Sequence, residues 1–223
     1  MIVTQEILVA NTAGVLALVV CMMTRHQIKK EWHFNDRAFN AMIWLTMLAL
    51  IAEAVSFVID GQPGKLVNVL QYILNAYTFV ASSGVGFLWV IFVDARIFRS
   101  TKRLKKWFCA LIVPFLLIIV LLFCDIFMHT GFIFSISADN VYERGNLVLI
   151  SYIFLFATYL FSIIIAVLSI YRDCYASFFP VHLFVLPCLV GTIVQGLFYG
   201  ISAVLRCTFT SFHTTASCEP ERL

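Results

Sequence analysis

The side chain with the clearest chemical potential in this sequence is Glu53, the only charged residue in a long apolar run. An ionisable group at membrane depth is costly to bury, so it indicates contact with a ligand, an ion or a proton. Amide side chains can share such a site, and Gln71 and Asn75 are four residues apart, on one face of a helix. The predicted ligand-binding residues are Glu53, Gln71, Asn75, Asn11 and Gln195.

A second interpretation of these polar residues is structural. Amides and acids in membrane helices also form hydrogen bonds that only hold a bundle together. The short turn from Asp60 to Lys65 joins the two segments, so they should run antiparallel and place Glu53 at a similar depth to Gln71. We therefore expect Glu53 to face the bundle interior within reach of Gln71 or Asn75, with both roles open.

No motif indicates catalysis. The sequence contains no G-x-x-x-x-G-K-[ST] phosphate loop, no H-E-x-x-H zinc motif and no G-x-S-x-G nucleophile elbow. The five histidines are scattered, and none of the seven cysteines has CxxC spacing. We predict no enzyme activity, no metal and no cofactor. The net charge of +3 is small and the basic residues lie in short loops, so nucleic acid is not an expected partner.

The composition requires a lipid bilayer as the solvent for these segments. Of the 223 residues, 62% are hydrophobic and 12% are charged, whereas a soluble domain has roughly 25% charged residues. Continuous runs of about 20 apolar residues predict spanning helices rather than the alternating strands of a β-barrel. The predicted spans are Ile7–Thr24, Ala38–Ile59, Leu66–Val93, Trp107–Cys124, Gly145–Tyr171 and a segment within Cys174–Leu205.

The predicted fold is therefore an all-α polytopic transmembrane bundle of six spans over residues 1–205, followed by a polar, disordered tail over residues 206–223. The loops after the first and third spans are rich in Lys and Arg, whereas those after the second and fourth hold one each, Lys65 and Arg144. Basic loops stay in the cytoplasm. We expect a multi-pass protein of a bacterial plasma membrane with its N-terminus outside and, after six crossings, its C-terminus outside as well.

Three other patterns concern packing and the ends of the spans. Gly196 and Gly200 form a small-xxx-small motif, which favours close helix packing within the chain or, as the alternative, a homodimer. Alternation of Ser and apolar residues over 132–144 predicts a short outer hairpin or lid. Asp94, Arg96 and the basic run 102–106 indicate an interfacial anchor near anionic lipid.

Four stretches carry a resemblance to a known family: EAVSFVIDGQPG (Glu53–Gly64), GFLWVIFVDARIF (Gly86–Phe98), NVYERG (Asn140–Gly145) and FPVHLFVLPCLVGTIVQGLFY (Phe179–Tyr199). They resemble the multi-helix membrane input region that precedes the diguanylate cyclase (GGDEF) domain in proteins of anaerobic Firmicutes. The resemblance covers residues 1 to 203. It implies a seven-helix sensor-like region followed by a cytoplasmic cyclase that makes cyclic di-GMP.

The chain departs from this family at its C-terminal side. It contains no GG[DE]EF sequence, and no seventh apolar helix follows the sixth span. From about Arg206 onward the sequence is expected to be a truncated or frame-shifted end. Cyclase activity is therefore not expected of these residues.

The favoured function is an integral membrane signal-input module that would regulate a diguanylate cyclase domain absent from this chain. Its expected partners are the lipid bilayer and an unknown small ligand. The alternatives are a small transporter or channel, with Glu53 on the substrate path, and a nonfunctional truncated remnant. A single acid at depth and the lack of an internal repeat favour the input module over a transporter.

Overall fold

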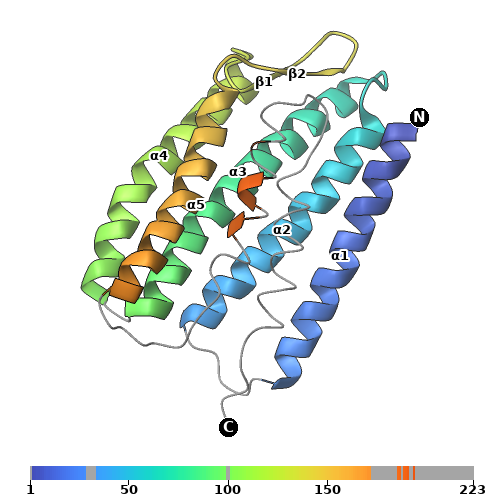
Figure 1. The fold of residues 1–223 in the computed structure, drawn as a ribbon. Coiled ribbons are helices and arrows are strands. Elements are labelled where there is room, and N and C mark those ends of the chain that lie inside the picture. The colour runs from blue at the N-terminus through green and yellow to red at the C-terminus, as the bar shows by residue number, and fades with distance from the viewer. Residues whose placement is uncertain are drawn as a thin grey trace.

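The computed structural model describes residues 2–28, 34–98, 101–171, 185–186, 188–190 and 193. Within these residues the chain forms long helices and one small antiparallel sheet (Figure 1). The elements, in chain order, are α1 (Ile2–Ile28), α2 (Phe34–Ile59), α3 (Lys65–Phe98), α4 (Thr101–Met128), β1 (Phe134–Ile136), β2 (Tyr142–Arg144) and α5 (Val148–Tyr171).

The helices confirm the prediction of an all-α fold and are compatible with a multi-pass membrane protein. Five of them are long and apolar enough to cross a bilayer, and backbone groups in hydrocarbon must be paired within the segment, which a helix achieves. The sixth predicted span, within Cys174–Leu205, lies mostly outside the described residues, as do the tail 206–223 and the predicted packing residues Gly196 and Gly200.

The first four helices extend beyond the predicted spans and the fifth begins later, and the starts of the fourth and fifth helices have a clear physical reason. The fourth helix begins at Thr101 rather than at Trp107, so the basic run belongs to the helix, in keeping with the good helix propensity of Lys and Arg. The fifth begins at Val148 rather than at Gly145. There, the backbone N–H groups of Gly145 and Leu147 donate to carbonyls of Ile133 and Phe132 and close the base of the hairpin.

Helix α3 is the centre of the bundle. It packs against α2, α4, α5 and β1, whereas α1 packs on α2 at one edge. The span of α3 is 67% buried inside the protein and that of α4 is only 11% buried. In Figure 1 the start of α1, the turn between α2 and α3, and the hairpin share one end, while α4 begins at the opposite end. We call these the hairpin end and the basic end.

The core has two parts that meet on α3. One lies between α1, α2, α3 and α5 and contains Trp89, Tyr159 and Met42, together with Val185 and Cys188 from the short described piece after α5. The other lies between α3, α4, α5 and the hairpin and includes Ile118 and Phe134. Because α3 contributes to both parts, it links the two halves of the molecule.

Helices α3 and α5 approach each other closely at Gly86. A Cβ atom at this position would lie 2.8 Å from Oγ1 of Thr158 and 3.2 Å from Cδ2 of Leu155, both on α5. Small residues drive association of helices in lipid by allowing such approach. Ser82 and Gly86 have small-xxx-small spacing, a signal that our sequence analysis did not single out.

Candidate functional site

Glu53 lies on the inner face of α2, six residues before that helix ends, and 6% of its surface is exposed. This confirms the prediction that it faces the bundle interior. Nδ2 of Asn11, on α1, donates a hydrogen bond of 2.9 Å to Oε2 of Glu53. Asn11 is 1% exposed, so the pair joins α1 to α2 within the protein.

The two predicted amides of α3 lie beside the next turn of α2. The hydroxyl of Ser56 donates to Oε1 of Gln71 at 2.7 Å, and Nδ2 of Asn75 donates to the same Oε1 at 2.9 Å and to Oγ of Ser56 at 3.1 Å. Ser56 is three residues after Glu53 and shares its helix face. The structure therefore places Gln71 and Asn75 against Ser56 between α2 and α3, and Glu53, three residues earlier on α2, against Asn11 of α1. We call these five residues the polar seam. A contact of Glu53 with Gln71 or Asn75 stays a prediction.

The seam continues to the hairpin through Asp60. Oδ1 of Asp60 accepts hydrogen bonds from Nε2 of Gln71 at 3.3 Å and from the backbone N–H of Tyr142 at 3.1 Å. The buried amide Gln71 is thus linked through one acid to the backbone of β2. A movement of Gln71 would therefore reach the hairpin through the two hydrogen bonds of Asp60.

Asn140, at the tip of the hairpin, binds it to the turn between α2 and α3. Its Nδ2 donates to the carbonyl oxygens of Gln62 at 2.7 Å and Gly64 at 3.3 Å, and its Oδ1 accepts from Nδ2 of Asn68 at 2.8 Å. Its own carbonyl accepts from the N–H of Gly61 at 3.0 Å. The paired strands confirm the predicted hairpin, and these bonds place it over the hairpin end of α2 and α3.

Asp125, which the sequence analysis did not select, positions the start of the hairpin. Its carboxylate is fully buried and accepts hydrogen bonds from the backbone N–H groups of Phe132, Ile133 and Phe134 and from the hydroxyl of Thr130. These donors would otherwise lack partners beside the membrane, where unpaired backbone groups are costly. An acid directly before the end of an apolar run, followed by Thr and Gly, was the available sequence signal.

Another buried acid, Asp94, lies near the end of α3 at the basic end. Nε of Arg103, on α4, lies 2.7 Å from Oδ1 of Asp94. The guanidinium also stacks over the ring of Phe98, 3.7 Å from its centroid, a cation–π contact. This pair fastens α3 to α4 and neutralises one cation of the basic run.

The remaining predicted site residue, Gln195, lies outside the described residues. Within the described part, no group of three or more His, Cys, Asp or Glu side chains could hold a metal ion. What the seam, with its continuation at Asp60, offers chemically is the carboxylates of Glu53 and Asp60, the hydroxyl of Ser56 and several amides. Among these, Oδ1 of Asn11 is buried and accepts no hydrogen bond from any described residue.

The comparisons with known proteins identify no relative, so the proposed function is argued from the geometry of the site. No protein-family model matches the chain, and searches of curated proteins and of solved structures return no significant match.

Proposed function

We propose that the protein is a membrane signal-input module that binds a small, positively charged hydrogen-bond donor beside Glu53 and Asn11. The observation that carries the proposal is the buried Oδ1 of Asn11, which accepts no hydrogen bond from the described residues, on the side chain that contacts the Glu53 carboxylate. An acceptor left unpaired in a membrane bundle costs free energy. A ligand with an ammonium group would donate to this acceptor and lie beside the negative charge of Glu53.

Helix α3 provides the route from this site to the basic end. It carries Gln71 and Asn75 near its first residues and Asp94 near its last. Its 34 residues correspond to about 51 Å at a rise of 1.5 Å per residue. A rigid helix of this length would transmit a shift of the polar seam to the Asp94–Arg103 pair, and through it to α4.

The orientation and the output are further parts of the proposal. We place the hairpin end outside a bacterial plasma membrane, because the described residues of the opposite end are richer in Lys and Arg. The output partner that we propose is a diguanylate cyclase domain. Its support is the resemblance carried by stretches such as Gly86–Phe98, and this chain itself has no cyclase motif.

Thermal melting of the detergent-purified full chain tests the ligand, with methylammonium chloride as the probe and potassium chloride as the ionic-strength control. We expect methylammonium to raise the melting temperature of the wild type but not that of Glu53→Gln, which keeps the shape and loses the charge. Asp139→Asn, at an exposed acid of the same end, should respond like the wild type. An unchanged wild type, or an equal rise in Glu53→Gln, would contradict the proposal.

Signal transmission requires a second measurement. Hydrogen exchange of the first turns of α4 should change when methylammonium is added to the wild type, and should not change in Glu53→Gln. A transporter or channel is the competing function that a buried acid also favours. Flux of methylammonium into proteoliposomes containing the wild type, absent from Glu53→Gln proteoliposomes, would establish transport in place of signalling.

A further inference from the structure

The first two turns of α4 concentrate positive charge at the basic end. Four basic residues lie there and no acid lies in the first turn. Arg103 is neutralised by the buried carboxylate of Asp94. The side chains of Lys102, Lys105 and Lys106 are exposed, and none of them forms a hydrogen bond or an ion pair with any residue that the structure describes.

The arrangement of these three lysines is electrostatically unfavourable in the isolated protein. Lys105 and Lys106 are three and four residues after Lys102, so all three share one helix face, with neighbouring Cβ atoms about 5–6 Å apart. Like charges at this spacing repel one another. The lysines also lie at the positive end of the helix dipole, which favours anions. An anion held against this face would relieve both effects.

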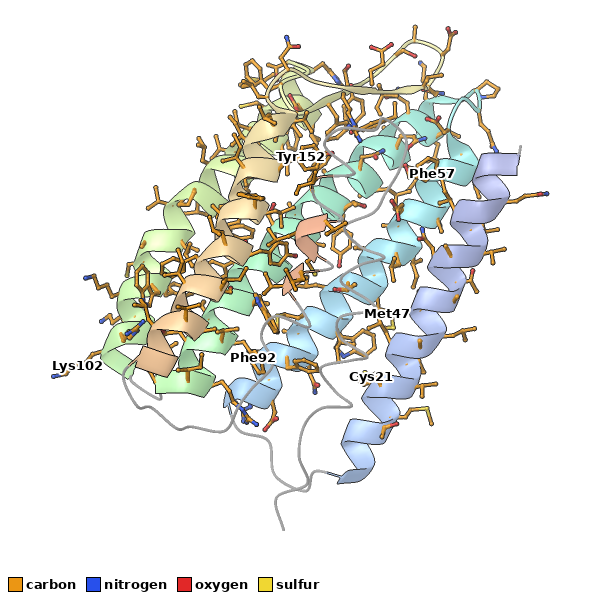
Figure 2. All side chains as sticks on the ribbon, in the orientation of Figure 1. Cys21, Met47, Phe57, Phe92, Lys102 and Tyr152 are labelled. Carbon is orange, nitrogen blue, oxygen red and sulfur yellow. The ribbon has the colours of Figure 1, made fainter. Side chains whose placement is uncertain are left out.

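The position of the lysines identifies the source of that anion. Directly after them, α4 presents exposed apolar side chains, Phe108, Val113 and Leu116 among them. Only 11% of the α4 span is buried, so this helix faces lipid along its length. Figure 2 shows Lys102 pointing outward from the lower end of α4, away from the bundle. The ammonium groups therefore lie where the hydrocarbon ends and the phosphates of lipid headgroups begin.

We propose that Lys102, Lys105 and Lys106 form a docking surface for the headgroups of anionic lipids, and that Arg103 does not belong to it. Phosphatidylglycerol supplies the required phosphate at the right depth, with acyl chains that cover the apolar face above it. Inorganic phosphate shares the charge but lacks those chains. The surface is separate in space from the ligand site at Glu53, which lies toward the opposite end of the bundle, and its lipid binding does not require that ligand.

Native mass spectrometry of the full chain in neutral detergent measures this directly. Phosphatidylglycerol and phosphatidylcholine are titrated separately, and the apparent Kd of each is taken from the lipid-bound fraction. We expect phosphatidylglycerol to bind at least tenfold more tightly than phosphatidylcholine, because each lysine near an anionic lipid surface contributes about fivefold in affinity. The variant K102Q/K105Q/K106Q should lose this preference, and the single variant K105Q should lose about fivefold.

Lys65 provides the matched control, since it is an exposed lysine at the first turn of α3, at the hairpin end. K65Q has the same change of charge as K105Q and should keep the preference for phosphatidylglycerol. Thermal melting checks that each variant is folded. Equal binding of the two lipids by the wild type, an unchanged triple variant, or an equal loss in K65Q would overturn the proposal. Displacement of phosphatidylglycerol by inorganic phosphate at equal concentration would also overturn it, by showing a free-anion site.

Discussion

Asn140 forms most of the hydrogen bonds that hold the hairpin against the turn between α2 and α3. Replacing this residue is therefore the most direct test of how the hairpin is held in place. Asn140 is 6% exposed and has a positive backbone φ of 58°. Asn adopts this left-handed conformation more readily than other non-glycine residues. Asn140→Ala therefore removes the side-chain hydrogen bonds and also imposes backbone strain.

The expected magnitude follows from these contacts. The three side-chain hydrogen bonds, of 2.7, 2.8 and 3.3 Å, contribute about 2–3 kcal/mol together. An alanine in the left-handed region costs roughly 1 kcal/mol more. The free energy of opening the hairpin should therefore fall by about 3–4 kcal/mol in Asn140→Ala. Asn140→Gly removes the same bonds without the strain, so it should lose about 1 kcal/mol less.

Hydrogen exchange with peptide-level mass spectrometry over residues 134–144 measures this opening. A loss of about 3 kcal/mol corresponds to roughly a hundredfold faster exchange of the hairpin amides. Asn140→Gly should exchange several-fold more slowly than Asn140→Ala. Asp139→Ala is the control, because Asp139 is the exposed neighbour on the same turn. If exchange in Asn140→Ala stays within about threefold of the wild type, the strand pair and Asp125 hold the hairpin without Asn140, and our reasoning is wrong.

Three further predictions concern other parts of the bundle. Asp125→Asn replaces one acceptor oxygen by a donor, so it should lower stability by about 2 kcal/mol; an unchanged melting temperature in detergent would contradict the role assigned to this carboxylate. Gly86→Leu should melt well below the wild type because the added side chain separates α3 from α5. Gly84→Ala should melt like the wild type, because its Cβ atom would meet Leu45 only at 3.6 Å. Equal melting of the two variants would refute the close contact at Gly86. In a cysteine-free background, Gln62→Cys and Lys105→Cys should react with an impermeant thiol reagent from opposite sides of the membrane, and labelling of both from one side would refute the topology.

The features that sequence reasoning predicted are those with a local cause. A charged residue in an apolar run must be buried or paired, so the burial of Glu53 could be expected from the run alone. The hairpin followed from alternating residues ahead of Asp139 and Asn140. Continuous apolar runs predicted helices, and five long helices are present in the part of the chain that the structure describes.

The features that sequence reasoning missed depend on contacts between distant segments. Asp125 could be recognised as the acceptor for three hairpin amides only once the chain reversed at Gly131. The partner of Gly86 is Thr158, on a helix far along the chain, so its spacing alone could not show which face it serves. The pairing of Gln71 with Ser56 depends on the relative height and rotation of α2 and α3, which residue spacing along the chain does not determine.

The middle layer of three described helices, α3, α4 and α5, contains no charged side chain that could form a path for ions. Between Asn75 and Asp94, α3 carries no charged residue, a gap of about 28 Å at 1.5 Å per residue. Helix α4 has none between Lys106 and Asp125, and α5 (Val148–Tyr171) has none at all.

The buried polar groups of α5 in this middle layer are hydroxyls, and two of them are already used. Thr158 donates to the carbonyl of Leu155, and Ser162 donates to the carbonyl of Thr158. Hydroxyls that donate to their own helix are poorly suited to binding or transferring an ion or proton, because ion and proton transfer need groups that can exchange hydrogen-bond partners. The same layer is well suited to holding α3 rigid against α5, which is what transmission from the Glu53 seam to the basic end requires.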